Sequence, residues 1–423
     1  MLFTHGPHKQ RPVTQRRSPA KTARVTRRCR GHRHTISVVC LLFGLSPTAT
    51  WSQTLPHCAS DTLTYGSARQ AGVDVEHVNA AARLIGEAVR QDRLRGAVVL
   101  VARNRKIILH KAYGWRDLEK TQPMHTDSLF RMASNSKAVT AAGLLLLVDQ
   151  GCLRLDDRIQ SYFPTFAGSR SGRITLRHLL THTSGLRIPT LFLKPLLQSS
   201  VEHPQAPSLL LEVARLGRIE PEQEPGSSWS YNNAGYNTIA GLIERTTGSY
   251  KSHLRCQLYE PLGMHDSSNH ESDADQSRMS AVFRKPSDAT WQVRWKPGDA
   301  ADFPFARGSG GMISTALDYA VFCQMLLNGG TYGHRRILSA KMVRQATQPQ
   351  THRIAASQHY GLGWFVSPET GIFSHAGSDG TWAWVDRRHQ LIGLVFTQTQ
   401  RESTHRERFR DLIIEACAPA SGR

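Results

Sequence analysis

The chain has 423 residues, of which 39% are hydrophobic and 20% are charged, the composition of a soluble globular protein with ample length for a buried core. Its formal net charge is +20, but residues 1–34 hold ten lysines and arginines and no acidic residue, so the remainder carries +10. That remainder has no run of five or six like charges and no basic patch with interleaved aromatics. We therefore expect no nucleic-acid partner.

The N-terminal residues 1–52 have the pattern of a targeting segment. A basic stretch is followed by an apolar run at residues 35–45, TISVVCLLFGL, and then by small residues that lead to Gln53. This run is too short to span a bilayer as a helix, so it predicts a signal peptide and a secreted or periplasmic (cell-envelope) protein. The alternative is an uncleaved anchor, the one case in which we expect contact with a membrane.

The next part of the chain changes from a helix pattern to a strand pattern. Residues 73–92 place apolar side chains on one face of a helix, and Gly96 opens two apolar runs joined at residues 103–106. We therefore expect a helix followed by a β-hairpin. Residues 153–165 are expected to form a loop or a short helix.

Between these segments, residues 130–147, FRMASNSKAVTAAGLLLL, predict a helix that contains Ser134 and stops at Gly151. Ser134 and Lys137 would share one helix face, with Cβ atoms about 5–6 Å apart. A lysine whose pKa is lowered by burial or nearby cations can take the proton of a serine hydroxyl and make it a nucleophile. The S-x-x-K pattern alone is not specific, because the leader contains a second copy.

The middle of the chain has a mostly helical pattern with Pro- and Gly-bearing loops. The expected helices lie at residues 176–181, 209–216, 236–245 and 316–327. Residues 359–399 then return to strand runs separated by glycines, and residues 406–417 predict a closing helix.

This order of elements predicts one sheet domain rather than several. We expect residues 53–423 to form an α/β (α+β) fold whose sheet part, about 70–165 and 355–423, is interrupted by an all-helical part at about 166–354. The helix that bears Ser134 lies where the two parts meet, which is a common place for a pocket.

Two further segments carry polar side chains that suit catalysis. In the first, Tyr231 and Asn233 follow the turn at residues 224–226 and precede a helix, so their side chains can point into a cleft. A tyrosine there can relay a proton once a nearby cation lowers its pKa, and Asn233 can donate to a substrate carbonyl. The plainer alternative is a loop tyrosine beside a capping asparagine.

The second segment is the glycine-bounded strand GIFSHAGSDG, which contains His375, Gly377 and Ser378. Gly377 permits close approach of the backbone, and the Ser378 N–H can supply an oxyanion donor. His375 would form a polar or cationic wall. The alternative is an ordinary surface turn.

Three short motifs occur in an order that is typical of one group of serine hydrolases: Ser134-x-x-Lys137, Tyr231-x-Asn233 and His375-x-Gly377. They resemble the motifs of the family that contains class C β-lactamases, DD-carboxypeptidases and family VIII esterases. LRHLLTHTSGL, PGSSWSYNNAGYNTIAGLIERTTG, GSGGMISTALDYAVF and HAGSDGTWAWVD resemble that family too, so the likeness covers about residues 70–415. It implies a β-lactamase/transpeptidase-like fold, an antiparallel sheet flanked by helices with an inserted all-helical subdomain.

The resemblance also implies roles for single residues. Ser134 would be the acylated nucleophile, Lys137 and Tyr231 would share the proton transfers, and Asn233 would orient the substrate. The backbone N–H groups of Ser134 and Ser378 would form the oxyanion hole. The substrate would be a small ester, amide or peptide, and no cofactor is expected.

One position departs from class C β-lactamases, which carry lysine where this chain has His375. Some carboxypeptidases and esterase-like members show histidine there, so efficient β-lactam hydrolysis is in doubt. A competing K-x-G begins at Lys296, but its proline removes a ladder N–H and it precedes the last strands, so we discount it.

Several other patterns are assigned to structure. His178 and His182 have the spacing of a helical zinc pair, but Leu179 stands where a metalloprotease has glutamate and no third ligand is evident. We therefore expect no metal. GSGG at residues 308–311 lacks the Lys-Ser/Thr of a phosphate loop and should instead let backbone approach the cleft. Three tryptophans are expected to fill the core: Trp364, Trp382 and Trp384.

Seven cysteines occur, and none forms the C-x-x-C pair of a zinc ribbon or a thioredoxin motif. Five remain beyond the leader, so at least one thiol should be free. Cys152, Cys256 and Cys323 have apolar neighbours and are expected to be packing residues rather than part of a disulfide framework.

These observations favour a serine hydrolase that forms an acyl-enzyme on Ser134. The alternatives are a D-amino-acid peptidase, DD-carboxypeptidase or β-lactamase, a penicillin-binding or sensor domain that acylates without turnover, and a basic surface-binding protein. The deacylation rate separates a hydrolase from a sensor, and the salt dependence of binding would reveal a surface-binding protein. The sequence carries no signal for oligomeric state or acyl-group preference.

Overall fold

The computed structural model describes residues 61–186, 195–286, 290–351, 354, 358–400 and 403–417, all within one compact unit, Thr50–Arg423. The leader and signal peptide expected at residues 1–52 lie outside these ranges.

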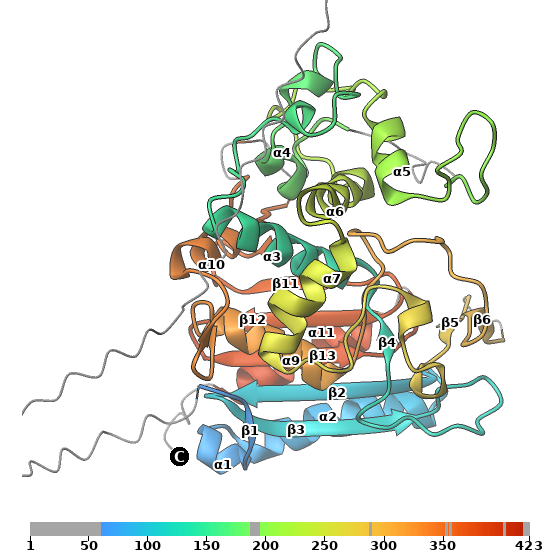
Figure 1. Cartoon of the computed structure of the whole chain (residues 1–423). Coiled ribbons are helices and arrows are strands. Elements are labelled where there is room, and N and C mark those ends of the chain that lie inside the picture. The colour runs from blue at the N-terminus through green and yellow to red at the C-terminus, as the bar shows by residue number, and fades with distance from the viewer. Residues whose placement is uncertain are drawn as a thin grey trace, which may run out of the picture. The chain divides into compact units, whose positions relative to one another are not determined.

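A seven-stranded sheet is built from both ends of this unit (Figure 1). Its strands run in the order β1-β3-β2-β13-β12-β11-β10. Their bounds are β1 Thr64–Tyr65, β2 Gly96–Arg103, β3 Lys106–Gly114, β10 Phe365–Val366, β11 Phe373–Ala376, β12 Thr381–Asp386 and β13 Leu391–Phe396. β1 pairs with β3 in parallel, and every other pair in this sheet is antiparallel. The predicted α+β class with an antiparallel sheet is therefore confirmed.

The hairpin expected after Gly96 is formed by β2 and β3. Asn104 and Arg105 join the two strands, with φ of 49° and 66°. Two successive left-handed residues are what a two-residue type I′ turn requires, and asparagine tolerates that conformation well.

Helices cover both faces of the sheet (Figure 1). The helices are α1 Ala68–Ala71, α2 Val75–Arg90 and α11 Thr404–Glu415 on one face, with α3 Ser136–Asp149, α9 Ala316–Leu327 and α10 Ala340–Ala346 on the other side. Successive strand residues point to opposite faces, so Val99 packs with α2 and α11 while Leu100 packs with α3 and α9. β2 is an unbroken apolar run because both of its faces are buried.

The helical part begins beyond α3, and α4, α5 and α6 lie above α3 in Figure 1, while α7 runs down beside it. It comprises α4 Leu176–Leu180, α5 Leu209–Leu216, α6 Asn233–Thr247, α7 Tyr250–Leu254, a π-helical turn at Arg255–Tyr259 and α8 Glu260–Leu262. α3 packs against α6 and α7, so the helix that bears Lys137 joins the sheet part to the helical part.

The structure differs from the expected middle of the chain in two respects. α9 packs on β2 and β13, so the helical part ends well before residue 354. Short strands also occur there in two-stranded ribbons: β5 Val282–Arg284 with β6 Gln292–Trp295, β7 Ile313–Ser314 with β4 Phe130–Arg131, and β8 Thr331–Tyr332 with β9 Arg335–Arg336. Runs of two to four residues are too short to show a period-2 pattern in the sequence.

The cysteines correct one expectation. Cys152, just past the end of α3, packs against the core as expected, but it is also disulfide-bonded. Its partner is none of Cys256, Cys323 and Cys417, which carry free thiols. Cys256 is exposed, so it is not a packing residue, whereas Cys323 is buried as expected. The apolar neighbours of Cys256 in the sequence do not reveal which way its side chain points.

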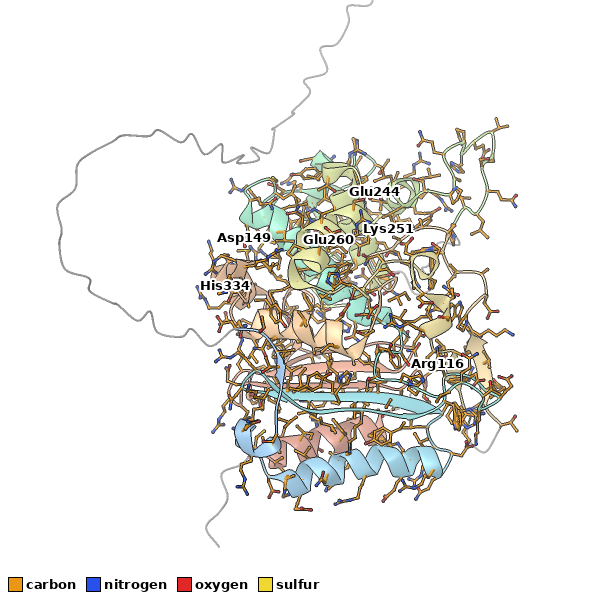
Figure 2. All side chains as sticks on the ribbon, turned by 60° about the horizontal axis from the view of Figure 1, so that its bottom comes forward. Arg116, Asp149, Glu244, Lys251, Glu260 and His334 are labelled. Carbon is orange, nitrogen blue, oxygen red and sulfur yellow. The ribbon has the colours of Figure 1, made fainter. Side chains whose placement is uncertain are left out.

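The charged side chains of the helical part are of both signs (Figure 2). Glu244, Glu260 and Lys251 share one side of it in that view. Lys251 pairs with Asp273 at 2.9 Å. This mixture of charges does not support the hypothesis that the protein is a basic surface-binding protein. Separately, within the described ranges no helix combines the length and apolarity needed to cross a bilayer.

Leu100→Ala tests the contribution of the two-sided core. Leu100 is fully buried, so removing its branched end should lower the free energy of unfolding by about 2–5 kcal/mol, measured by urea denaturation. Leu197→Ala is the matched control, because Leu197 is 62% exposed and its loss should change stability by less than about 0.5 kcal/mol. Equal effects of the two substitutions would contradict the arrangement of the core.

Candidate active site

Ser134 lies in a 3-10 turn, Ala133–Asn135, directly before α3. Ala133 has a φ of +45°, a conformation that costs a non-glycine residue about 1–3 kcal/mol and persists only where its surroundings impose it. Here they do, because the Thr381 hydroxyl donates to Met132 O at 3.0 Å and the Asn135 amide donates to Thr381 Oγ1 at 2.9 Å. β12 thus fixes the backbone that presents Ser134.

Lys137 lies one turn into α3, and its side chain is completely buried. Its Nζ lies 3.0 Å from Ser134 Oγ, 2.8 Å from Asn233 Oδ1 and 2.9 Å from Ser309 O. Burial, with a smaller contribution from the Arg307 charge, holds the pKa of Lys137 well below its usual range. A neutral amine has two N–H donors and one lone pair. The oxygens of Asn233 and Ser309 take the two donors, which leaves the lone pair for the Ser134 hydroxyl.

Tyr231 lies just before α6 and on the other side of Lys137. Its ring centroid is 4.8 Å from Lys137 Nζ, and its ring stacks on Phe365 with the two centroids 6.0 Å apart. Its hydroxyl interacts with the Ser134 side chain, which lowers the pKa of the phenol by less than burial raises it. Burial raises the pKa of Tyr231, so the phenol stays protonated. The expectation that a cation lowers this pKa was wrong, because desolvation by burial dominates.

His375 lies on β11 and is buried beneath the site. Its Nδ1–H donates to Ala376 O at 3.0 Å, and its Nε2 accepts from the Tyr360 hydroxyl at 3.1 Å. Burial, with a smaller effect of Lys137, lowers the pKa of His375 to about 3. The histidine is therefore a neutral polar group, and the cationic alternative for it was wrong.

Gly377 lies directly against the backbone that precedes Ser134. A Cβ at Gly377 would come within 2.4 Å of Met132 O and 2.4 Å of Thr381 Oγ1. The Gly377 N–H donates to Thr381 O at 2.6 Å, which closes the turn that carries the exposed Ser378. Only glycine permits this approach, and it brings Ser378 to the pocket beside Ser134.

A pocket of about 410 Å³ opens over these groups. Its lining includes Ser134, Asn233, Ser309, Ser378, Arg307 and Asp302. The pocket lining does not include Lys137, Tyr231 or His375, which lie beside it. A larger hollow of about 810 Å³ is lined by Lys296 and Pro297 of the discounted K-x-G, and none of the three motifs reaches it.

The sequence motifs do not include the charged groups of the pocket. Arg131 contacts Asp302 at 2.5 Å, Asp379 at 3.4 Å and Glu271 at 3.5 Å, and it lines the pocket together with Arg307. Arg131 precedes Ser134 by three residues and Arg307 immediately precedes GSGG. The only sequence signal for Arg131 and Arg307 was their proximity to the S-x-x-K motif and to GSGG, respectively.

The remaining sequence patterns occupy the following places in the structure. His178 lies within α4, where its Nδ1 accepts from Thr175 N at 3.3 Å, whereas His182 lies beyond the helix end. In the described part of the chain no group of three or more His, Cys, Asp or Glu side chains is placed to hold a metal. Ser309 of GSGG contacts Lys137, as expected of backbone at the cleft. The three tryptophans are buried: Trp364, Trp382 and Trp384.

Gly377→Ala is expected to damage catalysis by moving this backbone. The added Cβ must displace Met132 O, so the rate of ester hydrolysis should fall by about 10²-fold, the effect of losing one oxyanion donor. Gly172→Ala is the control, because its Cβ would approach most closely the flexible end of Gln160, at 3.2 Å, and would lie in ordinary contact with Phe166 O at 3.5 Å. Steady-state kinetics on both variants, with circular dichroism to confirm folding, check this. Equal activity in both would contradict the close approach.

Comparison with known proteins gives a consistent result. The model of the Beta-lactamase family matches residues 81–418. Penicillin-binding protein 4* of Bacillus subtilis (strain 168) is 27% identical over 70% of this chain and 67% of its own length. Esterase EstB of Burkholderia gladioli is 32% identical over 48% of this chain and 55% of its own.

Solved structures show the same fold. EstCE1, described as a hydrolase with promiscuous acyltransferase activity, superposes with a TM-score of 0.67 at 21% identity, over 80% of this chain and 98% of its own. The family model covers far more than half of the chain. The chain therefore belongs to the Beta-lactamase family and is a serine hydrolase of that fold.

Proposed function

We propose that this enzyme cleaves ester or amide bonds through an acyl-enzyme on Ser134. The observation that carries the proposal is the completely buried Lys137 amine, 3.0 Å from Ser134 Oγ and held with its lone pair free for that hydroxyl. Lys137 is therefore the general base. Tyr231, which stays a protonated phenol, is the donor that serves the leaving group.

The proton transfers balance in both half-reactions. In acylation, Ser134 Oγ bonds to the acyl carbon and its proton passes to Lys137. The bond to the leaving group breaks as Tyr231 gives it a proton, and the proton on Lys137 restores the phenol. In deacylation the transfers run in reverse: Tyr231 passes its proton to Lys137 and takes one from the water that attacks the ester carbon. Lys137 then protonates Ser134 Oγ as its bond to the acyl carbon breaks, so Ser134 regains its hydroxyl as the acid leaves.

Asn233 and the turn after β11 position the acyl group. Asn233 lines the pocket and binds Lys137 with its amide oxygen, so its amide nitrogen is directed to a substrate carbonyl. The N–H groups of Ser134 and Ser378 are the oxyanion donors, a role supported by the close packing of Gly377 on Met132.

An ester is the substrate class that the site supports best. His375 occupies the place of the class C lysine but is neutral, with both ring nitrogens engaged, so it supplies no charge for the carboxylate of a β-lactam. The 32% identity to an esterase agrees with this choice.

A carboxypeptidase acting on D-amino-acid peptides is the second candidate. Arg307 lines the pocket, and a guanidinium is suited to a terminal carboxylate. Hydrolysis of a D-alanyl-D-alanine peptide that is lost in Arg307→Met, with ester hydrolysis retained, would favour this candidate over the ester.

We also propose a secreted or periplasmic location. The disulfide at Cys152 supports it, because disulfides persist in oxidising compartments. The basic and apolar pattern of residues 1–45 supports it independently.

Covalent labelling tests the proposal. The protein is incubated with a fluorophosphonate, and the adduct is located by peptide mass spectrometry, in parallel with turnover of a p-nitrophenyl ester. We expect one adduct on the peptide that contains Ser134, together with steady-state turnover. Labelling with a single burst and no turnover would instead indicate a sensor that is acylated and not released. A folded protein that takes no adduct would overturn the proposed nucleophile.

A further inference from the structure

His182 holds the residues on both sides of Tyr231. Its carbonyl oxygen accepts from Ser230 N at 2.9 Å, and its Nδ1 accepts from Asn232 N at 3.2 Å. The ring centroids of His182 and Tyr231 are 4.4 Å apart. One fully buried residue therefore contacts the tyrosine and both of its neighbours.

The backbone of His182 is shaped for this double contact. Its φ is +60°, a left-handed conformation that is uncommon outside glycine and asparagine, and it lies just past the end of α4. That turn directs the carbonyl and the ring toward the same segment. Asn232 in turn caps α6, its side chain accepting from Gly235 N at 2.9 Å. The start of α6, which carries Asn233, is thus fixed through the same contact.

The ring must be neutral at Nδ1 to accept the Asn232 N–H, so its proton lies on Nε2. Tyr236, Tyr360 and Trp229 surround the ring, with centroids at 5.1, 4.7 and 6.2 Å, and Nε2 has no hydrogen-bond partner among the described residues. Burial lowers the pKa of His182 well below its usual range. The titratable groups Lys137 and His375 lower it further, because a positive charge on either would repel a protonated imidazole.

We propose that His182 is a positioning residue for the reaction, which fixes the Tyr231 hydroxyl for proton delivery to the leaving group. It touches no substrate and acts through Tyr231. The inference rests on the proposed function, in which Tyr231 is the proton donor. It predicts that loss of His182 matters most when the leaving group needs a proton.

Two substitutions separate the contacts. His182→Gly keeps the positive φ but removes the ring and the Nδ1 acceptor. His182→Asn also tolerates the positive φ, and it places an amide oxygen where Nδ1 was, so it should restore the contact with Asn232 N. His178→Asn is the matched control, because His178 also accepts a backbone N–H through Nδ1, at 3.3 Å from Thr175 N, and has no contact with Tyr231.

The readout is the dependence of the rate on the leaving group. For an alkyl ester, His182→Gly should lower kcat by about 10²-fold, the scale of general acid catalysis, and leave KM within about threefold. For a p-nitrophenyl ester, whose leaving group needs no proton, the loss should be under about fivefold. His182→Asn should recover most of the loss, and His178→Asn should show none.

A double-mutant cycle decides whether the effect passes through Tyr231. In a Tyr231→Phe background, His182→Gly should lower kcat for the alkyl ester by less than about a further twofold. The effects of residues that act as a unit are not additive. An equal loss with both esters, or a full additional loss in that background, would overturn the inference and leave His182 a structural residue. If the wild-type protein hydrolyses neither ester, the proposed function fails instead.

Discussion

Alanine at position 134 is expected to abolish fluorophosphonate labelling and to lower kcat/KM for a p-nitrophenyl ester by about 10⁴- to 10⁶-fold, the loss seen when a serine nucleophile is removed. The reason is chemical rather than structural. Lys137, Tyr231 and the turn held by Gly377 would all remain in place, but no atom would be left to form the acyl bond.

Two controls show that the loss of activity in Ser134→Ala is specific: its thermal stability and a serine substitution elsewhere. Ser134→Ala removes one oxygen from a backbone that Thr381 and Asn135 hold independently, so its melting temperature should stay close to that of the wild type. Ser161→Ala is the matched control, because Ser161 is exposed and its loss should leave labelling and turnover unchanged. Residual turnover above one per cent of the wild-type rate in Ser134→Ala would mean that another group is the nucleophile.

Much of the fold could be predicted because its elements have regular patterns. The helix at residues 316–327 was predicted at its observed bounds, and the β2–β3 hairpin was predicted with its turn. The role of α9 could not be predicted, because an all-apolar helix shows no preferred face and so does not reveal that it packs on the sheet. The order of strands in the sheet, in which β2 pairs with β13, depends on tertiary contacts and cannot be predicted from local sequence patterns.

The candidate site divides in the same way. The motifs brought Ser134, Lys137, Tyr231 and Asn233 together, and the structure places all four within one set of contacts. A motif specifies residue types, but the pKa of each residue depends on how deeply it is buried, which a motif does not predict. Desolvation raises the pKa of Tyr231, which a nearby cation was expected to lower. It also lowers the pKa of His375, which leaves the polar and not the cationic alternative for that residue.

The contacts of His182 were hidden for a related reason. In the sequence it forms a pair with His178 that has the spacing of a helical zinc pair, and the pair was assigned to structure. The pair is broken because α4 ends at Leu180 and His182 adopts a left-handed conformation. A positive φ at a non-glycine residue leaves no mark in the sequence, yet here it turns the ring from the face of α4 toward Tyr231.

Lys137→Met is expected to lower kcat/KM by about 10³-fold, because the base that takes the Ser134 proton is lost. Lys137→Arg should do no better, since a guanidinium stays protonated and cannot accept that proton. Lys251→Met is the control, because Lys251 lies at the surface and its pairing with Asp273 is remote from the motifs. Steady-state kinetics on the three variants would contradict the assignment if Lys137→Met kept a tenth of the wild-type rate.

The pH dependence gives a second, independent test of the same residue. Only the neutral amine is a base, so wild-type kcat/KM should rise with pH through the pKa of Lys137. Because that pKa is well below 10.5, the rise should be complete far below the range of an ordinary lysine. A rate that climbs only near pH 10 would contradict a buried, neutral base.

The lowered pKa of Lys137 should also make the stability of the fold depend on pH. Between the lowered pKa of folded Lys137 and 10.5, the unfolded chain binds one more proton than the folded chain, so the free energy of unfolding rises with pH across that window. At neutral pH the folded state therefore bears the cost of discharging the amine, and Lys137→Met removes it. Urea denaturation at pH 7 and pH 10 should show the variant gaining most, relative to the wild type, at pH 7. A residue that weakens the fold at the pH where its neutral form is needed is explained by catalysis and not by packing.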